Sequence, residues 1–261
     1  DGPGIVATVT GFLADLGCNI IDSAQYGDVN TKRFFMRVQF DLGENASLEE
    51  LQFGFAPLSR RFGMDHNMIS AAVKPKVLIL VSKFDHCLAD LLYRHSSGSL
   101  SMEIPVIVSN HETARPLAES HNIPYIHLPV TKETKREQEE KIEALIDEHE
   151  IDLVVLARYM QILSPELVTK LSGRAINIHH SFLPGFKGAR PYHRAHERGV
   201  KMIGATAHFV SEDLDEGPII SQDVLKVDHK ATPEDLIVAG RDVEARVLAD
   251  AVRMCTEQRV L

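Results

Sequence analysis

The spacing of apolar positions in the first 73 residues changes several times along the chain. Between Ile5 and Leu16 apolar side chains recur at helical spacing, after a turn at Asp1–Gly4. Apolar and polar side chains alternate over residues 33–40, which predicts a half-buried strand. The full pattern predicts helices at 5–16 and 47–63 and strands at 18–21, 33–40 and 68–73. This is a βαββαβ order whose first strand we expect to lie before Asp1.

A different pattern begins after the Lys74-Pro75-Lys76 junction. Short continuous apolar runs alternate with amphipathic stretches, which is typical of a parallel sheet with crossover helices. The runs predict strands at 77–81, 105–109, 124–128 and 152–157, and helices at 84–95, 111–121 and 131–149. We therefore predict an α/β protein with two domains, residues 1–73 and residues 76–261, the second built on a mainly parallel sheet flanked by helices.

Composition and charge narrow the class of protein. The 44% hydrophobic and 25% charged residues are typical of a soluble globular protein. A net charge of -9 argues against nucleic acid as a partner, because phosphate contacts need clustered Lys and Arg. The sequence contains neither a membrane span nor a signal peptide. Cys18, Cys87 and Cys255 are widely spaced, which predicts no disulfide framework and fits a cytoplasmic location.

The stretch from Ala175 to Ala195 carries the most chemistry. Residues 175–179 predict a strand, and side chains two apart on a strand share a face, so Asn177 and His179 point the same way while His180 points to the other side. Ser181 opens a loop rich in Gly and Pro. Polar groups where a parallel strand ends and a loop begins are where α/β folds bind ligands.

A second stretch, residues 204–222, predicts a strand from Ala205 to Val210, an acidic turn and another strand. The first strand carries His208, and the turn carries Asp215. Taken alone, His208 fits a core histidine and the acidic turn fits a solvated loop.

Together the two stretches resemble the folate-dependent formyltransferase family, over about residues 76–225. That family has an Asn-x-His-x-Ser segment followed by Leu-Pro, then a strand with a His and, seven residues later, an Asp. The resemblance implies that Asn177, His179 and Asp215 are catalytic. Residues 157–165 resemble the family segment that lines the pterin pocket. The implied substrate-binding residues are Arg158, Met160, Gln161, Ile162, Leu163, Ser181, Lys187, His208 and Val210. Without the resemblance, Ser181 fits a turn cap and Lys187 a solvated loop charge.

These catalytic residues suit attack on a formyl carbon. Negative charge develops on the formyl oxygen, and an Asn amide with a protonated imidazole can stabilise it. A His also moves protons near neutral pH, and the Asp215 carboxylate can raise its pKa and hold a water. We expect no metal and no cofactor, with the folate as substrate. The histidines at 179, 180, 193 and 196 lack carboxylate or thiolate partners at zinc-ligand spacing.

The loop after the first strand of the second domain bears on the acceptor of the formyl group. In glycinamide ribonucleotide formyltransferase, a member of the same family, this loop is Gly-rich and cradles the substrate phosphate. Here residues 82–87 contain no glycine, and Asp85 is negatively charged. We therefore expect water as the acceptor: 10-formyltetrahydrofolate is hydrolysed to tetrahydrofolate and formate, which balances folate pools and supplies formate for purine biosynthesis. The alternatives are formyl transfer to an amine such as glycinamide ribonucleotide, and a non-catalytic folate or amino-acid sensor. A tRNA formyltransferase would need a basic domain after the catalytic one, which we expect to be absent.

The segment DGPGIVATVTGFLADLG, residues 1–17, resembles an ACT domain. That resemblance implies a ferredoxin-like fold, binding of an amino-acid effector and a homo-oligomer, a dimer or tetramer. The implied regulatory residues are Gly2, Gly4 and Asn19, because free N–H groups at the start of a helix suit the carboxylate of an amino acid. The alternative is that this domain only dimerises.

Overall fold

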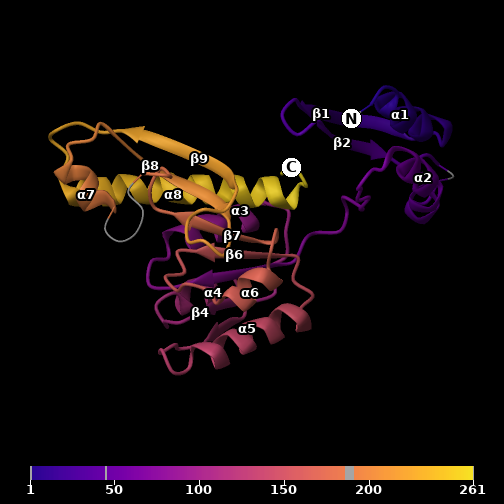
Figure 1. Cartoon of the computed structure of the whole chain (residues 1–261). Coiled ribbons are helices and arrows are strands. Elements are labelled where there is room, and N and C mark those ends of the chain that lie inside the picture. The colour runs from indigo at the N-terminus through magenta and orange to yellow at the C-terminus, as the bar shows by residue number, and fades with distance from the viewer. Residues whose placement is uncertain (1, 45, 186–190, 261) are drawn as a thin grey trace. The chain divides into compact units, whose positions relative to one another are not determined.

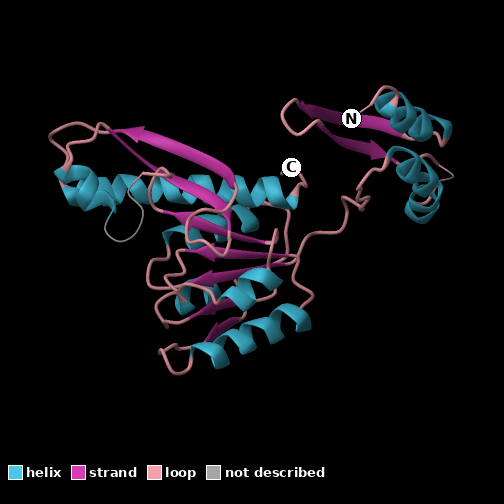
Figure 2. Ribbon diagram, in the orientation of Figure 1, coloured by secondary structure: helices cyan, strands magenta, loops and turns pink. Residues whose placement is uncertain are grey.

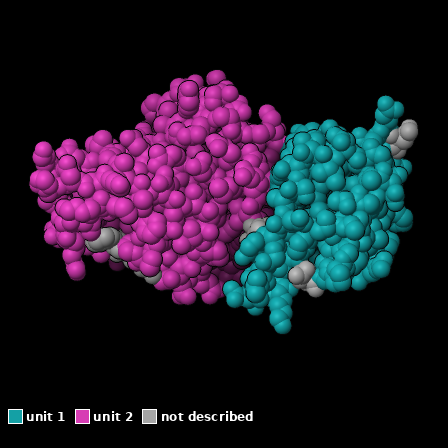
Figure 3. Space-filling model, turned by 90° about the horizontal axis from the view of Figure 1, so that it is seen from above, with its two compact units in different colours: residues 1–73, 261 teal, residues 74–260 magenta. Residues whose placement is uncertain are grey.

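In the computed structural model, residues 2–44, 46–185 and 191–260 are described. The chain divides into two compact units, with the division between Val73 and Lys74 (Figure 3). None of the helices within these described ranges is long and apolar enough to cross a membrane.

The front unit pairs two helices with a two-stranded sheet. The helices are α1 (Ile5–Asp15) and α2 (Leu48–Phe62), and the antiparallel strands are β1 (Asn19–Asp28) and β2 (Arg33–Asp41). A reciprocal capping box between Ser47 and Glu50 satisfies backbone donors where α2 begins. Both predicted helices and the first two predicted strands are confirmed. β1 extends beyond its predicted end because pairing with β2 satisfies its backbone even where its side chains are exposed.

The predicted strand at residues 68–73 is wrong. This segment forms no strand and is joined to α2 by a hydrogen bond in which Gln52 Nε2 donates to the Met68 carbonyl oxygen, 2.8 Å away. A strand needs a neighbour for its backbone N–H and C=O groups. β1 and β2 pair with each other, and no strand precedes α1 among the described residues, so the apolar pattern alone does not produce a strand.

The second unit is built on a seven-stranded sheet, whose strands are magenta in Figure 2. The strand order is β5-β4-β3-β6-β7-β8-β9. Neighbouring strands from β3 to β7 are parallel, whereas β8 pairs antiparallel with both β7 and β9. Their bounds are β3 (Val77–Val81), β4 (Ile107–Ser109), β5 (Tyr125–His127), β6 (Leu153–Ala157), β7 (Ala175–His179), β8 (Met202–Phe209) and β9 (Ile219–Lys226). The predicted α/β fold of this unit, a mainly parallel sheet with helices on its faces, is confirmed.

Helices cover both faces of this sheet (Figure 1). Alternate residues of β3 show the two layers: Val77, Ile79 and Val81 pack with α3 (His86–Ser96), α4 (Arg115–Ser120) and α8 (Pro233–Thr256). Leu78 and Leu80 pack on the other side with α5 (Lys135–Glu148) and α6 (Pro165–Lys170). The remaining helix, α7 (Pro191–Glu197), packs against the start of α8 through Tyr192 and Leu236.

The long helix α8 was not among the elements predicted above. Its start carries a clear signal, because Pro233 occupies the first helical position and Thr232 forms a capping box with Asp235.

The strand order places a topological switch between β3 and β6. From β3 the chain runs outward to β4 and β5, and it then returns to the other side of β3 to form β6 and β7. In open α/β sheets, ligands bind in the crevice outside the carboxyl ends of the strands at such a point. The loops after β3, β6 and β7 therefore surround the expected site.

Candidate active site

The structure brings His179 and Asp215 together. His179 is the last residue of β7, and its Nδ1 lies 3.2 Å from Asp215 Oδ1. Both side chains are largely buried. The other ring nitrogen, His179 Nε2, is buried and has no hydrogen-bond partner among the described residues. The carboxylate therefore orients the imidazole by one nitrogen and leaves the other free for chemistry.

Asp215 reaches this position from the loop between β8 and β9. Its own backbone is left-handed, with φ of 60°, and the loop folds back closely over β8. Gly217 makes that close approach possible, because a Cβ at this position would collide with the carbonyl oxygen of Phe209. The acidic turn is therefore a shaped loop that delivers a carboxylate to β7.

Asn177 and His208 form the other half of the cluster, as opposed residues of β7 and β8. His208 Nδ1 lies 2.8 Å from the Phe209 carbonyl oxygen, so this nitrogen carries the proton and donates. Its Nε2 then accepts from Asn177 Nδ2 at 3.3 Å. Burial lowers the pKa of His208 and keeps the ring neutral, in agreement with this tautomer. His208 thereby orients the Asn177 amide, and its Nε2 lies 3.8 Å from Asp215 Oδ1.

The electrostatics of the cluster favour an ionised Asp215. Burial opposes ionisation, but the hydrogen bond from His179 and the charge that His179 carries when protonated hold the pKa of the carboxyl below its usual value. His180, the residue after β7, has a lowered pKa as well, but for a different reason. Burial, with the positive charge of Arg158, lowers the pKa of His180 to about 3, so this ring stays neutral.

The loop after β7 is braced by buried hydrogen bonds. Thr206 Oγ1 donates to the Ser181 carbonyl oxygen at 2.9 Å and accepts from the Leu183 N–H at 3.0 Å. Gln222 Nε2 donates to Thr206 Oγ1 and to the Leu183 carbonyl oxygen. The hydroxyl of Ser181 donates to the Gly185 carbonyl oxygen at 2.7 Å, so in this structure it holds the loop.

The predicted substrate-binding residues after β6 lie in different environments. Met160 and Ile162 are 53% and 64% exposed, as expected of side chains that meet a ligand. Leu163 is buried in the core, and Val210 packs against the same core cluster. Gln161 is partly exposed, Arg158 is buried, and Lys187 lies outside the described residues. The binding role of each stays a prediction.

Two of the three predicted regulatory residues of the front unit line the same hollow, and the third does not. Gly2 and Gly4 line a hollow of about 550 Å³ at the start of α1, together with apolar side chains that include Ile5 and Phe34. Asn19 begins β1 and is not among the lining residues. A positive φ of 90° explains the glycine at position 4, because other residues are strained there.

Comparison with known proteins shows the relationship. The formyl transferase family matches residues 75–252. A formyltetrahydrofolate deformylase of Corynebacterium sp. (strain P-1) is 50% identical over 262 residues, an alignment that covers 100% of this chain and 91% of that protein. The chain belongs to the formyltetrahydrofolate deformylase family. The crystal structure of the deformylase from Burkholderia mallei agrees, with a TM-score of 0.95, 50% identity, and coverage of 100% of this chain and 92% of that one.

The fold of this deformylase family extends to a second group of enzymes. The phosphoribosylglycinamide formyltransferase of Anaplasma phagocytophilum has a TM-score of 0.67 and 31% identity, covering 72% of this chain and 90% of that one. The same architecture therefore occurs in a protein named for formylating an amine.

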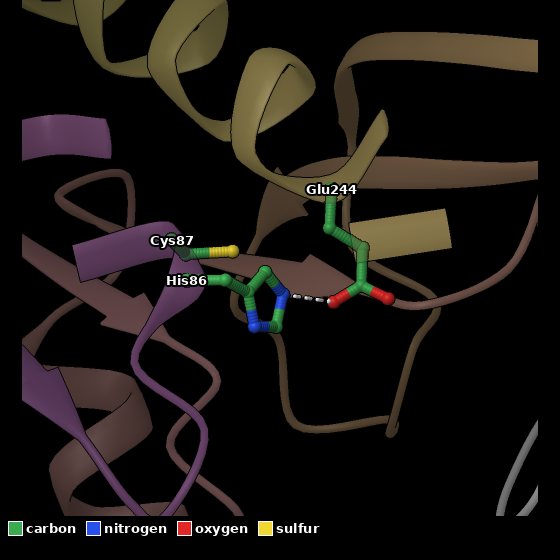
Figure 4. A group of neighbouring side chains, drawn as sticks. All are labelled: His86, Cys87 and Glu244. Carbon is green, nitrogen blue, oxygen red and sulfur yellow. Dashed lines mark hydrogen bonds and ion pairs between the residues drawn. The ribbon is translucent and has the colours of Figure 1, made fainter. Parts of the chain in front are cut away.

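A second polar cluster, centred on Glu244, was missed by the sequence analysis, and Figure 4 shows part of it. Glu244 of α8 is 1% exposed. Its Oε2 lies 2.8 Å from His86 Nε2 and 3.3 Å from Arg158 Nε, and its Oε1 accepts from the Tyr192 hydroxyl at 2.6 Å. The signal was a lone carboxylate on the apolar face of α8, between Val243 and Val247.

This cluster does not fit a metal ion. His86, Cys87 and Glu244 present ligand atoms within 4.8 Å of one another. The Arg158 guanidinium, however, already occupies the position that a cation would take beside Glu244. Burial also raises the pKa of the Cys87 thiol well above its usual value, which opposes the thiolate that metals require. The carboxyl of Glu244 is nonetheless ionised: burial opposes its charge, but His86, Arg158 and Tyr192 hold its pKa below the usual value.

Proposed function

We propose that this protein hydrolyses 10-formyltetrahydrofolate to tetrahydrofolate and formate. The observation that carries the proposal is the His179–Asp215 pair, in which Nδ1 is held by the carboxylate and Nε2 is left without a partner among the described residues. The names of the relatives support the same reaction. Asn177 supplies a neutral amide donor beside this pair.

The chemistry follows from these groups. Water adds to the formyl carbon and gives its proton to the His179–Asp215 pair. The formyl oxygen becomes an oxyanion, which the Asn177 amide and the protonated His179 stabilise. The bond between the formyl carbon and the folate nitrogen then breaks, that nitrogen takes the proton, and formate leaves. The exposed Met160 and Ile162 provide an apolar surface for the folate ring.

A direct assay tests this proposal. The purified protein is incubated with 10-formyltetrahydrofolate and no amine, and formate is measured over time. Replacement of His179 by Ala should lower the rate by about two to four orders of magnitude, the range for loss of a general acid–base or an oxyanion donor. The matched control is His229→Ala, which removes an exposed histidine from a turn after β9 and should leave the rate unchanged.

The outcomes separate the alternatives. No formate release by the native chain, with folate bound, would favour a non-catalytic sensor. Loss of the formyl group from the folate only when an amine is present, with a formylated amine instead of formate as the product, would favour a formyltransferase. In the proposed role the enzyme acts in the cytoplasm, where it balances folate pools and supplies formate for purine biosynthesis.

The front unit carries a second part of the proposal. We propose that residues 1–73 form an ACT-like, ferredoxin-like module that joins copies of the chain into a homo-oligomer and binds an amino-acid effector. Support comes from the hollow at the start of α1, which Gly2 and Gly4 line, and where no described side chain caps the first N–H groups of the helix.

An effector screen tests this module. One of the twenty amino acids should change the rate of formate release through a coupling of about 1–3 kcal/mol. Gly4→Ala should abolish that response, because Gly4 has a φ of 90°. Gly98→Ala imposes similar strain in the second unit, where Gly98 has a φ of 76°, and should preserve the response. If no amino acid binds or alters the rate, only the oligomerising role stands, and the mass of the protein in solution tests that role.

A further inference from the structure

The switch-point crevice between β3 and β6 raises a question of specificity. This fold also occurs in an enzyme named for formylating phosphoribosylglycinamide, an amine. A crevice at the carboxyl ends of β3 and β6, beside β7, is a natural site for such a second substrate. The side chains at this crevice in the present chain therefore bear on which acceptor reaches the formyl group.

An aromatic ring stands at the end of β3. Phe84 lies in the loop that joins β3 to α3, and it is 42% exposed, so it is not a core residue. The Cζ of Arg158, after β6, lies over the ring at 5.4 Å from its centroid. The Cζ of Arg241, on α8, lies over the same ring at 5.6 Å. Attraction between the guanidinium groups and the ring ties these segments together across the crevice.

Arg158, which lies over the Phe84 ring, forms an ion pair with Glu244. An amine acceptor in its protonated form would seek a carboxylate, and a phosphate would seek a cation or open backbone N–H groups. Glu244 accepts contacts on both of its oxygens, from Tyr192 on one and from His86 and Arg158 on the other. Arg158 is in turn neutralised by Glu244. Glu244 is therefore not available to hold an ammonium group, although Arg158 Nε and Nη1 have no hydrogen-bond partner among the described residues.

The Glu244 cluster also affects the electrostatics at the end of β7. The charge of Arg158 contributes to lowering the pKa of His180, the residue next to His179. A group bound at this crevice would thus lie beside the catalytic end of β7.

We infer that Phe84, held by Arg158 and Arg241 next to the Glu244 cluster, closes the crevice to an amine acceptor and so reserves the formyl carbon for water. Phe84 is thereby a specificity-determining residue, and this inference rests on the hydrolysis proposed above. In the excluded reaction, an amine nitrogen would bond to the formyl carbon and the carbon–nitrogen bond to folate would break. The proton lost by the amine would pass to the folate nitrogen, and no formate would form.

The experiment measures how the formyl group is partitioned. The full chain and its Phe84→Ala variant are given 10-formyltetrahydrofolate with glycinamide or, separately, phosphoribosylglycinamide, and the formylated amine and formate are both quantified. The ratio of formylated amine to formate should rise about tenfold or more in the variant, the range over which side-chain size in a pocket discriminates substrates. Tyr93→Ala removes an exposed aromatic side chain from α3 and should leave the ratio at the native value.

A second variant sharpens the result. Phe84→Ala combined with Tyr192→Phe also frees Glu244 Oε1 for an ammonium group, and should raise the ratio further. If Phe84→Ala melts below the assay temperature, Phe84→Leu takes its place, with a rise of the same sign expected. A ratio equal to the native one in these variants, while formate release continues, overturns the inference. Absence of formate release by the native chain without amine instead overturns the proposed hydrolysis, so the two failures are distinct.

Discussion

Two histidine–carboxylate pairs lie in the second unit, and they differ in which of their polar atoms already have partners. His179 and Asp215 meet at 3.2 Å, and His86 and Glu244 meet at 2.8 Å. In the first pair His179 Nε2 is buried without a hydrogen-bond partner among the described residues. In the second pair the carboxylate contacts Tyr192 and Arg158 as well as the histidine.

The comparison shows that residue type and distance do not by themselves make a reactive pair. Glu244 is closer to its histidine than Asp215 is, and it is more deeply buried. Each of its oxygens is occupied, however, and its contacts join α3, α7, α8 and the loop after β6. Asp215 comes from a loop and fixes one nitrogen of a ring whose other nitrogen is free. Arg158 beside Glu244 also has buried nitrogens without a hydrogen-bond partner among the described residues, but of the two histidines only His179 has such a buried ring nitrogen, and this marks its pair as the candidate catalytic one.

The largest expected effect is on the first pair. Asp215→Asn should lower kcat for formate release by about two to four orders of magnitude, because a neutral amide does not stabilise the protonated imidazole and can hold the ring in the wrong tautomer. Folate affinity should stay within about tenfold, since the carboxylate acts on the reacting centre. Single-turnover kinetics with a folate titration separate the two quantities. If the affinity for folate falls while the hydrolysis rate of bound substrate is unchanged, Asp215 binds the substrate. The contrast between a catalytic and a structural pair would then be wrong.

The second pair should instead respond in stability. Glu244→Ala leaves Arg158 buried without its counter-charge, which costs about 3–5 kcal/mol of unfolding free energy when one partner of a buried pair is removed. Hydrogen exchange on peptides from residues 74–260, followed through a urea series, measures this loss without interference from the front unit. Asp223→Ala, which removes an exposed partner of Arg246, is the control and should cost no more than about 1 kcal/mol. Equal losses in both variants would contradict a structural role for Glu244.

The smallest effect concerns His180, whose ring lies 5.2 Å from that of His179 and 6.3 Å from that of Tyr192, between the two pairs. Its folded pKa is lowered to about 3. The unfolded chain therefore takes up a proton near pH 6.5 while the folded chain does not, so acid lowers stability from that pH down to about 3.

His180→Gln should remove this part of the acid dependence, which amounts to at most about 1.4 kcal/mol for each pH unit. Urea unfolding of the native and variant chains at several pH values between 6.5 and 4.5 (roughly the window in which only histidines titrate) gives the two slopes. A variant that loses stability with acid as steeply as the native chain would show that His180 is protonated in the folded state.

The sequence predicted the parts of the site that depend on local geometry. Asn177 and His179 were placed on one face of a strand by the two-residue period, and the structure has both on β7 beside His208. Glu244 was missed because its role depends on three segments that are distant in the sequence, and no local pattern brings His86, Arg158 and Tyr192 to one carboxylate.

Other differences have the same origin. The spacing in residues 157–165 does not distinguish Leu163, which packs in the core, from the exposed Ile162, because the segment is a loop without a fixed period. The apolar run at 68–73 looked like a strand, but the existence of a strand depends on a neighbour that the run itself does not encode.

The change from parallel to antiparallel pairing at β7 also bears on the order in which the site assembles. β8, β9 and α8 follow one another closely in the chain, so their contacts close short loops, whereas β3 pairs with β6 across a long intervening segment. Loop-closure entropy favours the early formation of such short-range contacts and delays long-range parallel pairing. His179 belongs to the parallel part of the sheet, and Asp215 belongs to the hairpin that docks on it. Their contact forms when these two regions join, so the recovery of formate release during refolding reports the docking of the hairpin on the parallel sheet.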